Sequence, residues 1–356
     1  MVAYPFLREW GAARSVVMAP VRVRAPCVKI RAMRILVLGG TLFMGRAIVG
    51  RLVARGHDVS VLHRRDTHDL GPAVRNVRAD RRDLPKVRQL VSEGRFDAIF
   101  DLAYDWQHGT TADEVEAVAR SCGDNLARYV FMSSMAAYNP GLNKRETDAL
   151  VADDDPNDYA RHKASAERRL MHMHAQNRFP ATTFRPPFVH GPHQPFYREQ
   201  FFWDRLLAGR PIVLPDDGSA AMPWAFVEDV AESCVRALDL PEAAGQAFNV
   251  GHVESTTQRS FVELLARTAG VEARLVSVPR ARIQAAGGRI IGGNLYFGEY
   301  LDLPGFSLIV EKAPRVLGVA PTPIDKALQR GYEWYRTQPR RPADYSFDDR
   351  LLTSTP

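Results

Sequence analysis

The sequence predicts an α/β fold in which a doubly wound parallel sheet is followed by a smaller C-terminal substrate domain. Short apolar runs alternate with helix-like stretches over roughly 150 residues from Met33 onward. A glycine-rich turn, Gly39 to Gly45, directly follows the first apolar run. A chain of 356 residues also suits two domains of ordinary size. Alternating strands and helices form βαβ units, so the sheet is expected to be parallel and of the Rossmann type.

The strands and helices are placed by hydrophobic spacing. Apolar runs of four to seven residues are typical of strands buried on both faces, and apolar residues three and four apart indicate helices. The expected strands are 34–38, 58–62, 73–79, 96–102, 128–133 and 181–185. The expected helices are 46–55, 84–93, 112–121 and 157–176.

The turn after the first strand is a candidate pyrophosphate site. Backbone N–H groups in the first turn of a helix lack internal partners, and the helix dipole makes that end attractive to anions. Gly39 and Gly45 permit a tight turn and close helix packing, whereas Leu42 stands where a middle glycine is usual. The expected cofactor contacts here are Gly39, Gly40, Thr41, Leu42, Phe43, Met44 and Gly45.

The end of the second strand bears on the choice of cofactor. An NAD site usually has an acidic residue there, but this chain has His63, Arg64 and Arg65, with no acid before Asp66. A guanidinium pairs with phosphate through two hydrogen bonds. We therefore expect NADP to be preferred over NAD, although both arginines could instead be merely solvated.

The expected organisation has four parts. Residues 1–32 form an N-terminal extension expected to be disordered, and 33–186, with returns near 225–250, form the NAD(P)-binding domain. The substrate domain covers 187–224 and 251–340, followed by a tail, 341–356. The extension has six basic residues and one acidic residue, so it holds most of the net charge of +6. The favoured interpretation is that residues 1–32 are an over-long start and that Met33 opens the true domain. A secretory signal and a transit peptide are the alternatives, and all three interpretations stay open.

Composition limits the other classes of protein. The three cysteines, Cys27, Cys122 and Cys234, are far apart, which argues against a disulfide framework or a zinc site and suits a reducing compartment. The sequence has no apolar run of the length needed to cross a bilayer. We expect a cytoplasmic protein with no membrane partner and no metal; a homodimer stays open.

Several motifs occur in an order that resembles the extended short-chain dehydrogenase/reductases, the NAD-dependent epimerase/dehydratase family. The motif Y-x-x-x-K stands here as Tyr159 and Lys163, and the family serine as Ser134, 25 positions before the tyrosine. Further similar segments are 185–192, 227–231 and 248–251. The turn reads G-G-T-x-F-x-G, similar to a branch that includes chloroplast stem-loop RNA-binding proteins and uncharacterised bacterial members.

The resemblance implies a catalytic group of Ser134, Tyr159 and Lys163. Residues four apart on a helix share a face, so a lysine ammonium is expected to lower the pKa of the phenol and make Tyr159 a proton acceptor. Lys163 would also hold the nicotinamide ribose, and Ser134 would hydrogen-bond the substrate oxygen or Tyr159. Additional expected cofactor contacts are Asp80, Leu102, Ala103, Pro186 and Phe188.

Departures from the family pattern bear on the substrate. Phe188 stands where nucleotide-sugar epimerases offer an asparagine to the diphosphate, and 221–226 lacks the arginine that grips the same group. Met135 and Ala136 replace the acid of the dehydratases. These changes favour a redox or epimerisation step on a hydroxyl or keto carbon of a less charged small molecule. The expected pocket residues are Tyr104, Met135, Phe188, Met222, Trp224 and Arg259.

Two alternative functions stay open. Arg198, Arg205 or Arg259 could substitute as phosphate grips, which would allow a nucleotide-sugar epimerase or reductase. A nucleic-acid-binding, non-enzymatic relative is the alternative from a different class. The near-neutral charge of the chain after residue 32 and the intact Ser134, Tyr159 and Lys163 favour the enzyme, so no nucleic-acid partner is expected.

Other conspicuous residues are given ordinary structural roles. His172 and His174 face different ways on a helix, and His190 and His193 are placed in a proline-rich loop. The aromatic residues between 196 and 203 are expected in the core or pocket wall of the smaller domain. The acidic stretch 153–155 is expected to be a solvated loop, with Asp158 as the N-cap of the following helix.

Overall fold

The computed structural model describes residues 31–340 and 343–353. The expectation for the N-terminal extension therefore lies almost wholly outside the described residues. A seven-stranded parallel sheet forms the centre of the first lobe, in the order β11-β6-β5-β4-β1-β2-β3. Its strands are β1 (Arg34–Leu38), β2 (Asp58–His63), β3 (Val74–Arg78), β4 (Ala98–Asp101), β5 (Arg128–Met132), β6 (Ala181–Arg185) and β11 (Gln246–Asn249). The doubly wound fold predicted from the sequence is confirmed.

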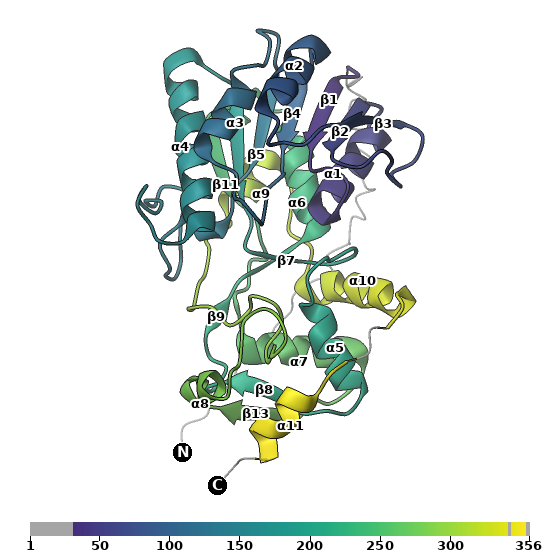
Figure 1. The fold of residues 1–356 in the computed structure, drawn as a ribbon, viewed down its shortest axis with the longest axis vertical. Coiled ribbons are helices and arrows are strands. Elements are labelled where there is room, and N and C mark those ends of the chain that lie inside the picture. Colours follow the sequence, from purple (N-terminus) through teal and green to yellow (C-terminus); the bar gives the residue numbers. More distant parts are fainter. Residues whose placement is uncertain (1–30, 341–342, 354–356) are drawn as a thin grey trace, which may run out of the picture. The chain divides into compact units, whose positions relative to one another are not determined.

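Helices cover both faces of this sheet (Figure 1). Successive residues of β1 point to opposite faces, so Ile35 and Val37 pack in one core and Leu36 and Leu38 in the other. The first core includes helices α1 (Phe43–Ala54), α6 (Val227–Arg236) and α9 (Lys312–Leu317). The second includes α2 (Leu84–Gly94), α3 (Ala112–Ala119) and α4 (Asp158–Asn177).

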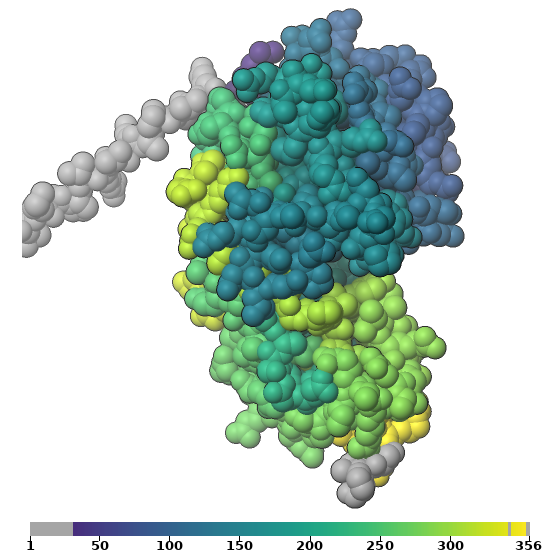
Figure 2. Space-filling model, turned by 90° about the vertical axis from the view of Figure 1, so that its left-hand side faces the viewer, coloured from purple at the N-terminus to yellow at the C-terminus, as the bar shows by residue number. Residues whose placement is uncertain are grey.

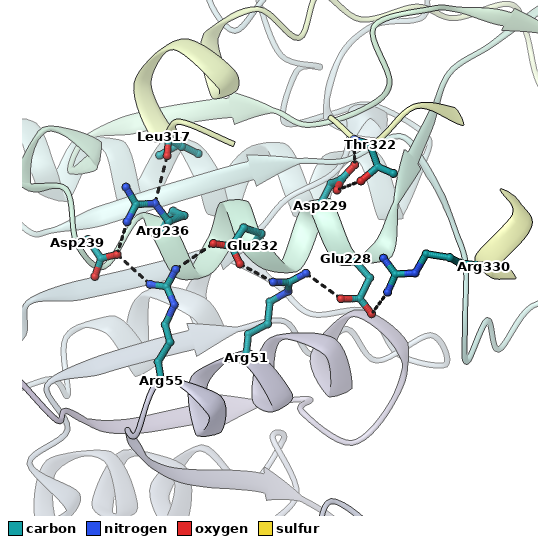
Figure 3. Close-up of polar contacts among 10 residues, drawn as sticks. All are labelled: Arg51, Arg55, Glu228, Asp229, Glu232, Arg236, Asp239, Leu317, Thr322 and Arg330. Atoms are coloured by element: carbon teal, nitrogen blue, oxygen red, sulfur yellow. Dashed lines mark hydrogen bonds and ion pairs between the residues drawn. The ribbon is translucent and has the colours of Figure 1, made fainter. Parts of the chain in front are cut away.

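Charged side chains join α1 to α6 in a ladder (Figure 3). Arg51 donates to Glu228 at 2.8 Å and to Glu232 at 2.5 Å, and Arg55 bonds Glu232 and Asp239 at 3.0 and 2.9 Å. All of these groups are partly exposed, so each pair contributes modestly to stability. Together they fix the helix that follows the glycine turn against a helix from the second half of the chain.

The smaller lobe is built from short pairs of strands and several helices. The strand pairs are β7 (Phe188–His190) with β10 (Trp224–Phe226), β8 (Ile212–Pro215) with β13 (Leu275–Val278), and β9 (Ala221–Met222) with β12 (Thr256–Thr257). The helices are α5 (Glu199–Leu207), α7 (Gln258–Ala269), α8 (Arg280–Ala285), α10 (Ile324–Thr337) and α11 (Ser346–Thr353). Figure 2 shows residues from the first half of the chain, in blue and teal, beside green and yellow residues from the second half.

Four sequence expectations need correction. Asn157, not Asp158, is the N-cap of α4, because its side-chain oxygen accepts from the Ala160 amide. The expected tail contains α11, which buries Phe347 and Leu351 in the core of the smaller lobe. The helix α9, expected in the substrate domain, packs in the core on one face of the sheet instead. His190 ends strand β7 and is fully buried, rather than lying in a loop.

A buried ion pair attaches α4 to the sheet. The guanidinium Nε of Arg185 donates to both carboxylate oxygens of Glu167 at 2.9 and 3.1 Å, and both side chains are almost wholly buried. Arg185 also donates to the Tyr138 hydroxyl at 2.5 Å, and that hydroxyl donates to Asn249 at 2.8 Å. The free-energy cost of burying these polar groups is thus offset by a chain of hydrogen bonds that links all four of them.

Replacing Arg185 with Ala should lower the free energy of unfolding by about 3–5 kcal/mol, because Glu167 would be left buried without its cation. Chemical denaturation measures this change. The control is Arg120→Ala, which breaks an exposed pair with Glu116 in α3 and should cost less than about 1 kcal/mol. Equal losses in the two variants would contradict a structural role for the buried pair.

Candidate active site

The turn between β1 and α1 can be formed only by glycine at two of its positions. Gly39 has a φ of +87°, and a Cβ there would lie 3.0 Å from the backbone of Ala103. A Cβ on Gly45 would lie 2.1 Å from the carbonyl oxygen of Gly39. Leu42, the N-cap of α1, makes no side-chain cap, and the first turn carries no acidic residue. The open amides at this helix end fit a pyrophosphate.

The end of β2 leaves two arginines available. His63, the last residue of β2, bonds Asn76 through its Nε2 at 2.5 Å, and Asp66 pairs with Arg78 at 2.7 Å. The guanidinium groups of Arg64 and Arg65 are exposed and make no hydrogen bond or ion pair within residues 31–340 and 343–353. They therefore remain free to bind a phosphate group.

The other expected cofactor contacts lie where parallel strands end. Asp80 follows β3 and is exposed, Leu102 and Ala103 follow β4, and Pro186 and Phe188 follow β6. The carboxyl ends of parallel strands meet at one edge of the sheet, where nucleotides bind in doubly wound folds. Ala103 lies against Gly39, so this edge is continuous with the glycine turn.

The three expected catalytic residues come together at the same edge. Tyr159 and Lys163 lie one turn apart on α4, and the Lys163 ammonium is 5.9 Å from the centre of the Tyr159 ring. Lys163 is buried and donates to the carbonyl oxygen of Met132, at the end of β5, at 2.7 Å. Ser134 follows β5, and its hydroxyl oxygen accepts from the Ala136 amide at 3.1 Å.

The electrostatics differ from the expectation. Burial raises the pKa of Tyr159, and the Ser134 hydroxyl and the Arg198 guanidinium only partly oppose this rise. Burial also lowers the pKa of Lys163 to about 7, against the opposing charge of Asp101. The expected lowering of the Tyr159 pKa is therefore wrong, because desolvation outweighs the Ser134 hydrogen bond and the Arg198 charge that oppose it.

Two aromatic rings contact the Tyr159 ring. The Tyr104 ring meets the Tyr159 ring edge-on at 4.8 Å, and its hydroxyl bonds His162 at 3.1 Å. The Trp106 indole stacks on the Tyr159 ring at 5.0 Å and 20°, although Trp106 is 60% exposed. Phe196 meets Trp106 edge-on at 5.9 Å. Trp106 is not among the residues expected from the sequence. Its position three residues after Ala103, in the loop that follows β4, is the feature that could have indicated a place at the site.

The remaining expected pocket residues divide into two groups. Met135, Phe188, Met222 and Trp224 are all buried in the core of the smaller lobe. Their expected contact with the substrate stays a prediction. Arg259 contacts the Asp217 carbonyl and the Ser277 hydroxyl instead of the Tyr159 group.

Three of the histidines make hydrogen bonds within the protein. His190 and His252 are buried with their Nε2 atoms 2.8 Å apart, and burial lowers the pKa of both. His174 bonds the carbonyl oxygen of Phe179. Within the described ranges there is no group of three or more His, Cys, Asp or Glu that could hold a metal ion. Likewise, no helix in those ranges is long and apolar enough to cross a membrane.

The fold and the glycine turn define a Rossmann-type nucleotide-binding protein. A model of the NAD-dependent epimerase/dehydratase family matches residues 35–251, and the chain belongs to this family. The order of the motifs places it among the extended short-chain dehydrogenase/reductases.

The relatives of this chain carry names that describe different functions. The chloroplast stem-loop binding protein of 41 kDa b from Arabidopsis thaliana is 27% identical over 345 residues, covering 90% of this chain and 84% of that protein. UDP-glucose 4-epimerase from Mycolicibacterium smegmatis is 27% identical over 267 residues, covering 67% and 83%. The structure of UDP-glucose 4-epimerase with UDP-glucose from Thermotoga maritima has a TM-score of 0.68 at 21% identity, covering 85% and 99% of the two chains.

Replacing Gly45 with Ala should weaken cofactor binding and lower stability by about 1–3 kcal/mol, because the new methyl group would collide with the Gly39 carbonyl. Titration with NADP and chemical denaturation measure the two effects. The matched control, Gly50→Ala in the same helix, has no atom within 4 Å of the added Cβ. It should bind cofactor normally and gain about 0.5–1 kcal/mol of stability. A Gly45 variant that behaves like the control would refute the role of this glycine turn in cofactor binding.

Proposed function

We propose that the protein is an NAD(P)-dependent oxidoreductase or epimerase that acts on a hydroxyl or keto carbon of a small molecule. The observation that carries the proposal is the meeting of Ser134, Tyr159 and Lys163 at the sheet edge that also holds the glycine turn. Family membership and the UDP-glucose 4-epimerase among the relatives support an enzyme.

The protonation state of Tyr159 favours reduction as the first chemical step. A bound nicotinamide supplies or accepts the hydride. With its pKa raised by burial, Tyr159 is protonated at neutral pH and can give its proton to a substrate carbonyl oxygen. Ser134 orients that oxygen or the phenol. Lys163, held by the Met132 carbonyl, would hydrogen-bond the ribose of the cofactor.

Two other functions have support from the relatives. A nucleotide-sugar epimerase is favoured by the UDP-glucose 4-epimerase relative, and a nucleic-acid-binding role by the stem-loop binding relative. An RNA shift assay over a series of salt concentrations separates the second from the enzyme, because binding through phosphate contacts falls steeply with salt.

Replacing Tyr159 with Phe should reduce turnover by roughly 10²–10⁴-fold, because the proton donor is lost while the ring and its stacking remain. The measurement is NADPH oxidation with a panel of keto compounds, next to a cofactor titration that should be nearly unchanged. Turnover at the wild-type rate would rule out Tyr159 as the acid/base.

NADP should bind about 10–100-fold more tightly than NAD, because Arg64 and Arg65 can each donate charge-assisted hydrogen bonds to the 2′-phosphate. Calorimetric titration of both cofactors measures the ratio. Changing both arginines to Ala should bring the ratio of NADP affinity to NAD affinity close to one. The control is Arg75→Ala, which removes an exposed arginine paired with Asp58 and should leave the ratio unchanged. Equal affinities in the wild type would contradict the proposed preference.

A further inference from the structure

Arg198, the residue before helix α5, presents two unused donors. Its Nε donates to the carbonyl oxygen of Glu299 at 3.2 Å. Its guanidinium carbon lies 5.3 Å from the centre of the Phe188 ring and 4.7 Å from that of Phe196. Neither Nη atom makes a hydrogen bond or an ion pair with any residue in the described ranges 31–340 and 343–353. The free part of the group is thus its outer edge, with two parallel N–H directions.

The acids next to Arg198 bond other groups. The Glu199 carboxylate accepts from the Gly191 amide at 3.0 Å and from the Gln194 side chain at 3.3 Å, and burial raises its pKa to about 7. The Glu299 carboxylate accepts from the Tyr197 amide at 2.8 Å. Burial lowers the pKa of Arg198 itself. A desolvated cation without a bonded anion is costly, and an incoming anion would relieve that cost.

The position of Arg198 relates it to the reaction centre. Its charge acts on Tyr159, where it opposes the rise of the phenol pKa. Phe196, which flanks the guanidinium, also touches Trp106, the ring stacked on Tyr159. Phe188, whose ring also lies beside the guanidinium, follows the strand that ends at the proposed cofactor edge. The guanidinium and the phenol therefore belong to one site.

The backbone around Arg198 is held in place. The Gln194 side chain donates to the Val189 carbonyl at 2.7 Å. Tyr197 and Glu299 exchange two bonds, because the Glu299 amide also donates to the Tyr197 carbonyl at 3.0 Å. Because the backbone around Arg198 is already ordered, little conformational entropy is lost when a ligand binds.

We propose that Arg198 binds a carboxylate group of the substrate, while Trp106 and Phe196 contact a flat apolar part of the same molecule. This proposal rests on the proposed function and names its substrate class, a keto or hydroxy acid. Two coplanar Nη donors match the two coplanar oxygens of a carboxylate. The same fork also matches two oxygens of a phosphate, so the test includes phosphate ligands.

The test compares acids with their neutral amides. Benzoylformate and 3-benzoylpropionate, each beside its primary amide, are titrated calorimetrically into the NADP-bound protein. At least one acid should bind about 10–100-fold more tightly than its amide, as expected for a charge-assisted bidentate pair. Arg198→Gln should bring this ratio close to one, with amide and NADP affinities retained. Arg198→Lys should keep part of the ratio, because the charge remains but the fork is lost.

Controls separate this proposal from folding and from the chemistry. Arg259→Gln removes an arginine of the same lobe that contacts Asp217 and Ser277, and it should keep the full ratio. Thermal unfolding of each variant reports its folding. Tyr159→Phe should also keep the ratio. Wild-type turnover in that variant with the ratio intact would refute only the proposed function.

Three results would overturn the carboxylate proposal. The first is an acid-to-amide ratio near one in the wild type, or no saturable binding of either acid. The second is a full ratio in Arg198→Gln. The third is tighter binding of phenyl phosphate or UDP than of both acids, lost in Arg198→Gln, which would make the ligand group a phosphate.

Discussion

The buried pair of Arg185 and Glu167 is the contact on which the arrangement of the site depends. Glu167 lies one turn beyond Lys163 and two turns beyond Tyr159, so one face of α4 carries all three. Arg185 ends β6 immediately before Pro186, at the edge where the cofactor residues gather. Fixing Glu167 to the sheet therefore sets both the depth and the rotation of the helix that carries the phenol and the ammonium.

The two sides of the site are constructed differently. The proposed cofactor side consists mainly of backbone: a glycine turn too tight for a Cβ and strand ends at one edge. The ladder from Arg51 and Arg55 to α6 keeps the helix after that turn in place. The substrate side consists of side chains from loops, among them Trp106 and Arg198, held by contacts between distant segments. Under the proposed function, such a division would let the cofactor site stay the same while the substrate side varies.

The same division explains what the sequence could predict. The strands and the glycine turn follow from local spacing and from parallel topology, whereas the grouping of Ser134, Tyr159 and Lys163 follows from the resemblance to the family. The setting of Arg198 does not, because Phe188 and Glu299 reach it from positions 10 and 101 residues away. The Tyr159 pKa was misjudged for a similar reason: burial is a property of the whole packed structure, whereas spacing along α4 is local.

The stack of Trp106 on Tyr159 competes weakly with any ligand that packs on the same ring. A ligand that needs the face of the phenol must first displace an indole that is tethered only two residues from Tyr104. An aromatic pair contributes about 0.5–1.5 kcal/mol, which corresponds to a factor of about 2–12 in the apparent dissociation constant. Molecules that offer Trp106 a new flat partner recover this loss, and molecules that do not are disfavoured by it. Under the proposed function, Trp106 would therefore favour flat substrates before any polar group is recognised.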